Sequence, residues 1–387
     1  MKTVPFTRAD LLLPKRDFDK WAVVACDQYT SEPDYWAAVE AIVGDTPSAF
    51  RLILPEVYLS SPDIKARIAR INQTMKDYLE RDVFASYPQS MVFVERRLAD
   101  GRVRRGIVGA VDLDAYDYTE GSVSPIRATE GTVLSRIPPR VEIRRDAPLE
   151  LPHIMILVDD PENRLFPSTP DGEVLYDTPL MQNGGHIRGS LMSDAAIDRL
   201  LSGLAEMADS RALLFAMGDG NHSLATAKAC VDEKNPLSRY ALAEIVNIHD
   251  PALDFEPIYR VVFGCDPKAL LDAAKVYFGG QSEHTVTCLY GDTAEAFAVD
   301  GLTAGALQAF LDDYLKEHPE AEVDYIHGAD TVRALTQAPG TIGFLFEGIG
   351  KGELFDYVER HGALPRKTFS MGEAHDKRFY MECRRIR

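Results

Sequence analysis

The chain has 387 residues, enough for two or three modules or for one large α/β domain with an insertion. Its formal net charge of −18 repels DNA and anionic membranes on average, which opposes nucleic-acid and membrane-surface partners. Hydrophobic residues make up 45% of the chain, so it can bury a sizeable core and we do not expect disorder.

The cysteine pattern and the N-terminal residues bear on the compartment. The cysteines number five and form no Cys-x-x-Cys pair, which is typical of reduced thiols rather than of a disulfide framework or a zinc site. The N-terminal residues lack an apolar stretch of signal-peptide length, and eighteen apolar residues never follow one another. We therefore expect a cytoplasmic protein without a membrane span.

The first part of the chain alternates apolar runs with amphipathic stretches. Residues 21–26 predict a buried strand, and Pro33 opens a helix. Asp100-Gly101 between the alternating runs 91–98 and 103–113 is typical of a β-hairpin. Pro138-Pro139 is expected to break any helix in its region. Further strands are expected at residues 51–55 and 152–158, a long helix at 61–80 and a β-ribbon at 173–191.

The middle of the chain predicts a strand–turn–helix unit. Ser193 is expected to cap a helix that runs to residue 208, and residues 211–217 form a nearly pure apolar strand. A turn at Gly218 to Gly220 then leads into a helix at 221–231. Two more strands are expected at residues 243–248 and 256–263.

After Gly264 the predicted elements become shorter and alternate regularly. Helices are expected at residues 267–278, 304–317, 330–337 and 354–361, and strands at 285–289, 296–299, 323–326 and 341–346. The sequence thus predicts an α/β fold with a mixed sheet. We expect a main domain over residues 1–263, a smaller α/β region over 264–346, and a C-terminal segment, 347–387, that returns to the main domain.

The turn at Gly218 to Ser223 combines three features that favour an anion. Glycine allows close backbone approach, the first turn of a helix has unpaired amides, and the helix dipole is positive at that end. Asparagine and serine add neutral donors, and histidine adds one that can be charged. The alternative is a strand-to-helix connection without a ligand, and no P-loop Lys-Ser/Thr follows. The candidate phosphate-binding residues are Gly218, Asp219, Gly220, Asn221, His222 and Ser223.

Several motifs resemble, in the same order along nearly the whole chain, those of an uncharacterised ParB/SpoOJ-like family (domain of unknown function family 1015). The most distinctive is Asp219-Gly220-Asn221-His222, which resembles the family's Asp-Gly-His-His-Arg pattern. The other matching stretches are residues 26–29, 54–56, 127–132, 257–260 and 364–368.

That family is similar to the ParB/sulfiredoxin superfamily, which includes free-serine kinases. The resemblance implies a nucleotide-binding core and phosphoryl transfer from ATP or ADP, with Mg²⁺, to a small hydroxylated metabolite such as free serine. Ser223 stands where the family has arginine, so a phosphate-pairing guanidinium is missing. Arg127, Arg260 and Lys367 are candidates to supply the charge.

Phosphoryl transfer often uses a carboxylate to accept the hydroxyl proton, and three are candidates. Asp27 and Glu32 follow a predicted buried strand, and Glu130 lies in the Arg127 motif. Their alternatives are a turn cap for Asp27, a first-turn helix charge for Glu32 and a salt bridge for Glu130. Asp219 and His222 are too few ligands to define a metal site, and His153 is expected to be structural.

Two other functions compete with a small-molecule kinase. A nucleotide-sensing or DNA-partitioning protein fits the ParB-like motifs, although the acidic charge and the lack of a basic helix-turn-helix oppose it. A phosphate-ester hydrolase could use the same turn with water as acceptor, and the sequence does not separate it from a kinase.

Overall fold

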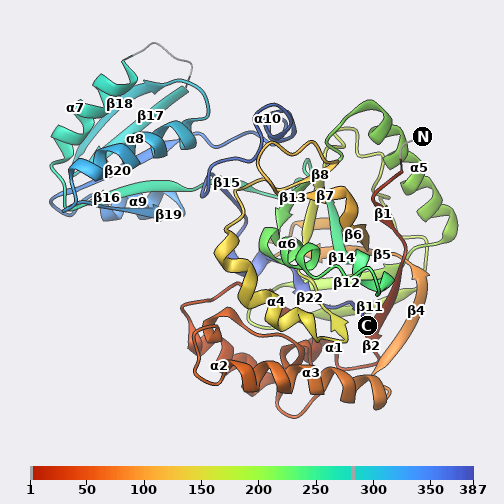
Figure 1. Cartoon of the computed structure of the whole chain (residues 1–387). Helices are drawn as coiled ribbons and strands as arrows, with labels where there is room; N and C mark the ends of the chain where they lie inside the picture. The colour runs from red at the N-terminus through yellow and green to blue at the C-terminus, as the bar shows by residue number, and fades with distance from the viewer. Residues whose placement is uncertain (1–2, 280–283) are drawn as a thin grey trace. The chain divides into compact units, whose positions relative to one another are not determined.

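The computed structural model describes residues 3–279 and 284–387, and the chain divides into two compact units (Figure 1). The larger unit comprises Met1–Leu253, Phe355–Ala363 and Glu373–Arg387. The smaller unit comprises Asp254–Leu354 and Leu364–Gly372. Both units combine helices with β-sheet, so the fold is mixed α/β, as the sequence predicted.

The larger unit is built on a ten-stranded mixed sheet. β10 pairs in parallel with β14, and β8 pairs in parallel with β13 and β7, whereas the other neighbouring strands are antiparallel. In spatial order the strands are β11 (Val174–Pro179), β12 (His186–Leu191), β5 (Val92–Arg97), β6 (Val103–Asp112), β14 (Tyr240–Asn247), β10 (Met155–Val158), β13 (Phe215–Asp219), β8 (Ile126–Arg127) and β7 (Tyr116–Asp117), with β1 (Phe6–Thr7) beside β6.

Alternating side chains place a hydrophobic core on each face of this sheet. On β5, Val92 and Val94 face one core and Phe93 faces the other, as the period of two along a strand requires. The Phe93 core also contains apolar residues of α5 (Asp194–Ser210) and α6 (Asn221–Ala229). These two helices therefore pack on the Phe93 face of the sheet.

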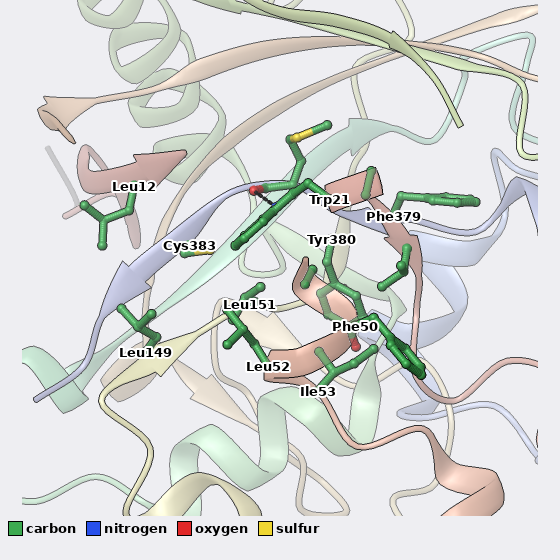
Figure 2. Packing of buried hydrophobic residues seen from close by; sticks show 14 of the residues in the cluster. Leu12, Trp21, Phe50, Leu52, Ile53, Leu149, Leu151, Phe379, Tyr380 and Cys383 are labelled. Atoms are coloured by element: carbon green, nitrogen blue, oxygen red, sulfur yellow. Dashed lines mark hydrogen bonds between the residues drawn. The ribbon is translucent and has the colours of Figure 1, made fainter. Parts of the chain in front are cut away.

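The Val92 core is formed by the N-terminal segment and the C-terminal tail. Its helices are α1 (Phe18–Trp21), α2 (Pro33–Val43) and α3 (Ile64–Glu80). Trp21 lies fully buried there and donates its indole N–H to the Met381 carbonyl at 3.0 Å (Figure 2). A four-stranded sheet joins the two ends of the chain, in the order β4 (Phe84–Ser90), β2 (Ala9–Pro14), β23 (Cys383–Arg385) and β9 (Leu149–Glu150), and β22 (Phe379–Tyr380) pairs with β3 (Val23–Val24).

Buried charges fix the tail against the main sheet. The Arg378 guanidinium donates to Glu244 at 2.7 Å, to Glu382 at 2.6 Å and to the Pro152 carbonyl at 2.9 Å, with all three side chains almost completely buried. A buried ion pair is favourable only when its geometry and hydrogen bonds are good, and here both carboxylates share one planar donor. This network holds the residues before and after Arg378 in place.

The structure corrects three local predictions. Residues 51–55 do not form a strand; a 3₁₀ helix spans Ala49–Leu52, capped by the Ser48 hydroxyl. Pro138-Pro139 does not break a helix but lies in the first turn of α4 (Ile137–Arg145), where backbone N–H groups have no helical partner to lose. The expected strand at 21–26 shrinks to β3, because α1 ends at Trp21.

The smaller unit contains an antiparallel five-stranded sheet in the order β18 (Thr293–Val299), β17 (His284–Tyr290), β20 (Thr341–Phe346), β16 (Tyr259–Phe263) and β19 (Glu322–Ile326). Its other elements are α7 (Pro267–Phe278), α8 (Thr303–Glu317), α9 (Ala329–Leu335) and the strand pair β15 (Phe255–Pro257) with β21 (Phe369–Met371). The unit includes β16, whereas the sequence prediction ended the main domain at residue 263. α10 (Leu354–His361) lies almost entirely in the larger unit.

None of the helices formed by residues 3–279 and 284–387 combines the length and apolar character that crossing a membrane requires.

Candidate functional site

The predicted turn joins β13 directly to α6. Gly220 caps the helix in the left-handed region, with φ at 81°, and its carbonyl accepts the Leu224 amide at 2.9 Å. A side chain here would be strained by the positive φ, and its Cβ would lie 3.1 Å from the Ile154 Cα. Glycine is therefore required both by the conformation and by the close approach of Ile154, which immediately precedes β10.

The first turn of α6 presents amides that an anion could accept. Within the part of the chain that the structure describes, the Asn221 and Ser223 N–H groups donate to no protein atom. The Gly220 amide, by contrast, donates to the Asp219 carboxylate at 2.9 Å. Two amides at the positive end of a helix dipole can bind a phosphate oxygen.

Opposite charges flank this turn. The Lys377 ammonium lies 3.6 Å from the Asp219 carboxylate, and both side chains are largely buried. Lys377 precedes Arg378, so the buried charge network of the tail also places this lysine beside the turn. The Asp219 oxygen that faces Lys377, Oδ2, is buried and accepts no hydrogen bond among the described residues.

Asp27 and His153 form an ion pair beside the same turn. The His153 Nε2 lies 3.3 Å from the Asp27 carboxylate and 3.4 Å from the Ser223 hydroxyl. Its Nδ1 lies 2.8 Å from the Tyr380 hydroxyl, which also accepts the Cys26 amide at 3.1 Å. The arrangement gathers residues from the N-terminal segment, α6 and the tail around one imidazole, which lies just before β10.

The two partners of this pair shift each other's titration in opposite directions. Burial alone would raise the pKa of Asp27, but the facing His153 imidazole, the Gln28 amide and Lys377 lower it well below its ordinary value. Burial likewise disfavours the charged imidazole, yet Asp27 outweighs it and raises the pKa of His153 well above its ordinary value. Near neutral pH the site therefore contains a carboxylate and an imidazolium.

This geometry differs from a serine–histidine–aspartate triad. In a triad, the serine and the aspartate contact different nitrogens of the imidazole, so that one nitrogen can accept the serine proton. Here both Ser223 and Asp27 face the same nitrogen, Nε2, while Nδ1 faces the Tyr380 hydroxyl. The arrangement therefore does not activate Ser223 as a nucleophile.

A cavity of about 140 Å³ adjoins the turn. Its lining includes Cys26, His153, Ser223 and Tyr380, and most of its other lining residues are apolar. Leu52, Ile53, Leu149, Leu151 and Tyr380, which all contribute to its wall, lie in the packed region of Figure 2.

The other predicted residues near the turn have varied surroundings. The His222 Nε2 accepts the Val133 amide at 3.3 Å, so this nitrogen cannot donate to a phosphate while that bond lasts. Arg127 is buried on β8, next to β13, and its Nε donates to the Ser124 carbonyl at 2.8 Å. Glu130 is half-buried, and Glu32 is an exposed residue at the start of α2.

Arg260 and Lys367 belong to the smaller unit. The Arg260 guanidinium is fully buried and donates to the Ile258 carbonyl, to the Lys367 carbonyl at 2.8 Å and to the Gln308 side chain at 3.1 Å. These bonds tie β16 to the segment that precedes β21. The exposed Lys367 has a positive φ of 59°.

Sequence reasoning did not select three residues that the structure brings to the turn. His153 was expected to be structural, and Lys377 and Tyr380 were not singled out. Tyr380 and His153 are 227 positions apart, so no local spacing connects them. The only available hint was that the tail was expected to return to the main domain.

A comparison with known protein families matches residues 5–335 to the family described as protein of unknown function (DUF1015). The chain belongs to the DUF1015 family. No curated protein matches this DUF1015 chain.

Three of the solved structures that resemble the DUF1015 chain have low identity to it. A conserved hypothetical protein from Pyrococcus furiosus has 13% identity and a TM-score of 0.36, and the match covers 68% of this chain and 89% of that protein. A free serine kinase in complex with AMP has 12% identity and a TM-score of 0.40, and the match covers 70% of this chain and 90% of that kinase. A free serine kinase variant in complex with ADP has 11% identity and a TM-score of 0.41, and the match covers 72% of this chain and 92% of that kinase. Similarities of this extent support no argument about chemistry.

Proposed function

We propose that this protein binds a nucleotide phosphate at the start of α6 and transfers a phosphoryl group to a small hydroxylated compound. The observation that supports this most strongly is the position of Ser223. Its free amide belongs to the anion-binding turn, while its hydroxyl faces the Asp27–His153 pair and the cavity. A phosphate and an acceptor hydroxyl could thus be held on the two sides of one residue.

The charged side chains around the turn balance one another, so they could hold a phosphate and neutralise part of its charge. Asp27 and Asp219 are negative, and alone they would repel an anion. His153 and Lys377 oppose them, and we assign to these two the role that sequence reasoning gave to Arg260. Arg127, which lies on β8 next to β13, remains a candidate for further positive charge, whereas Lys367 belongs to the smaller unit.

Mg²⁺ would complete this balance. The described residues contain no group of three or more potential metal ligands. Mg²⁺ is, however, usually held by one or two carboxylates together with phosphate oxygens. The buried Asp219 Oδ2 accepts no hydrogen bond, although the Lys377 ammonium lies 3.6 Å from it, and it could serve as such a carboxylate ligand. A bound Mg²⁺ would neutralise charge on the phosphates.

Asp27 is the carboxylate best placed to act on the acceptor. The acceptor oxygen would form a bond to phosphorus as the bond to the leaving oxygen of ADP or AMP breaks, and the hydroxyl proton would pass to Asp27. Its lowered pKa makes Asp27 a weak base, but phosphoryl transfer depends more on positioning and charge than on base strength. Glu32 and Glu130 remain candidates, and Asp27 ranks first because it pairs with the imidazole that contacts Ser223.

The test is product formation from ATP or ADP, Mg²⁺ and a panel of alcohols that begins with serine, followed by ³¹P NMR. We expect a phosphate ester, and we expect Asp27→Asn to slow its formation by roughly 10²-fold or more. Asp34→Asn, which changes an exposed carboxylate on α2, is the matched control and should leave the rate unchanged. Absence of both turnover and nucleotide binding would refute the proposal. Release of inorganic phosphate without an ester would indicate the hydrolase instead.

A further inference from the structure

The cavity beside α6 is mainly apolar, which sets the chemistry of what it can bind. Its wall includes Leu52, Leu54, Met75 and Leu151, all nearly fully buried, and the half-buried Leu59 and Ile143. Figure 2 shows Leu52, Ile53 and Leu151 close to one another in this region. Such a surface stabilises an apolar group through burial.

The charged residues of the wall already have protein partners. Arg140 pairs with Glu56, and Arg144 pairs with the buried Glu150, which also accepts a bond from Arg384. A zwitterion such as serine would lose hydration on entering, and these paired groups would offer it little in return. The cavity therefore favours a neutral ligand.

The polar groups of the wall include hydroxyls and the His153 imidazolium, which is paired with Asp27. Ser223, Thr226, Tyr380 and His153 contribute to the wall, and Ser223 belongs to the phosphate-binding turn. The volume of about 140 Å³ is close to the ~150 Å³ of an apolar cavity that accommodates benzene in another protein. A group of about six carbons would fill it.

We propose that the cavity binds an alcohol with one branched aliphatic or phenyl group, whose hydroxyl points toward His153 and Ser223. Its identity as the phosphoryl acceptor rests on the proposed function. Binding in the cavity does not, because the wall, the volume and the paired charges define it without a nucleotide.

The test measures binding of benzyl alcohol, 3-methylbutan-1-ol, 1-octanol and serine to the full-length protein by isothermal titration calorimetry, without nucleotide. We expect the first two to bind saturably and serine to bind at least tenfold more weakly. Ala147→Phe adds a ring at a buried wall position and should weaken benzyl alcohol binding at least tenfold, with ADP affinity changed less than twofold.

A second variant keeps the test informative if Ala147→Phe does not fold. Leu59→Ala enlarges the cavity and should shift the preference toward 1-octanol by at least threefold. Leu201→Ala, an equal truncation of a half-buried leucine on α5, should not change the order of affinities.

The outcomes separate this inference from the proposed function. Serine binding as tightly as benzyl alcohol, or alcohol affinities that neither cavity variant alters, would overturn the inference even if ADP binds. Size-selective alcohol binding without any nucleotide binding would support the cavity assignment and refute phosphoryl transfer.

Discussion

Substitution of Gly220 by alanine tests whether the turn has the conformation on which the site depends. Gly220 has a φ of 81°, and a Cβ at this position would lie 3.1 Å from the Ile154 Cα and 3.2 Å from its Cγ1. Two separate costs follow. One arises from a left-handed backbone with a side chain, and the other from crowding against the segment that leads into β10.

The magnitudes of the two costs can be separated with a second glycine. An alanine in the left-handed region costs roughly 1–2 kcal/mol. Crowding of a packed site typically adds about 1–3 kcal/mol. Gly121 has a similar φ of 76°, but no atom lies within 4 Å of its hypothetical Cβ. Gly121→Ala should therefore incur only the first cost. Gly220→Ala should lower the free energy of unfolding by roughly 1–3 kcal/mol more than Gly121→Ala does.

Urea unfolding followed by tryptophan fluorescence measures this difference. The chain has two tryptophans, Trp21 and Trp36, and both are buried in the larger unit, so their fluorescence reports the unfolding of the unit that contains the turn. We also expect Gly220→Ala to weaken ADP binding at least tenfold, because the α6 amides are displaced, while Gly121→Ala retains wild-type affinity. Equal losses of stability in the two variants would refute the close approach of the turn to Ile154.

Three further predictions concern charge. Lys377→Met should weaken ADP binding about tenfold and reduce its salt dependence, as measured by calorimetry from 50 to 500 mM NaCl; unchanged affinity would remove this lysine from the site. Arg378→Met should lower the free energy of unfolding by about 3–5 kcal/mol in the same urea assay, because it leaves two buried carboxylates unpaired; a loss below 1 kcal/mol would contradict the network. Because the pKa of His153 is raised in the folded protein, its ion pair stabilises the fold fully below about pH 6.5, and this stabilisation is lost as the pH rises through the folded pKa. The difference in the free energy of unfolding between wild type and His153→Gln should therefore narrow as the pH rises above about 6.5. Because the pKa of Asp27 is lowered, the stability that Asp27 contributes is lost only as the pH falls below about 4. A difference in the free energy of unfolding between wild type and His153→Gln that does not change from about pH 4 to 9 would contradict the ion pair.

Local patterns predicted the elements whose determinants lie close together in the sequence. The Asp100-Gly101 hairpin, the strand–turn–helix at β13 and α6, and α7 at Pro267–Phe278 all occur as expected. Each of these elements contains, within its own residues, the hydrophobic periodicity, the turn residues or the helix cap that determines it. The same holds for the Ser193 cap of α5, whose hydroxyl accepts the Ala196 amide.

Predictions were wrong where tertiary context decides the outcome. The apolar residues 51–55 satisfy a strand pattern, but Ser48 caps a 3₁₀ helix there and Leu52 packs into the N-terminal core instead. The two prolines at 138–139 suit the first turn of a helix as well as a loop, and only the packing of α4 against α6 selects the helix. The composition of a short segment does not contain this information.

The candidate site was predictable only in part. The turn and Asp27 follow apolar strands, and that pattern is visible in the sequence. The imidazole between them comes from the segment just before β10, and its hydroxyl partner comes from β22 in the tail, so the cluster depends on contacts between distant parts of the chain. The likeness to the ParB/sulfiredoxin superfamily stays a prediction from the sequence.

The most direct test of phosphate binding at the start of α6 is a titration of ¹⁵N-labelled protein with ADP and Mg²⁺, followed by amide resonances. The proposed site predicts saturable shifts that are largest at Asn221 and Ser223, together with loss of these shifts in Gly220→Ala. Binding of ADP that leaves both amides unmoved would contradict the central claim, as would the absence of any shift at saturating nucleotide.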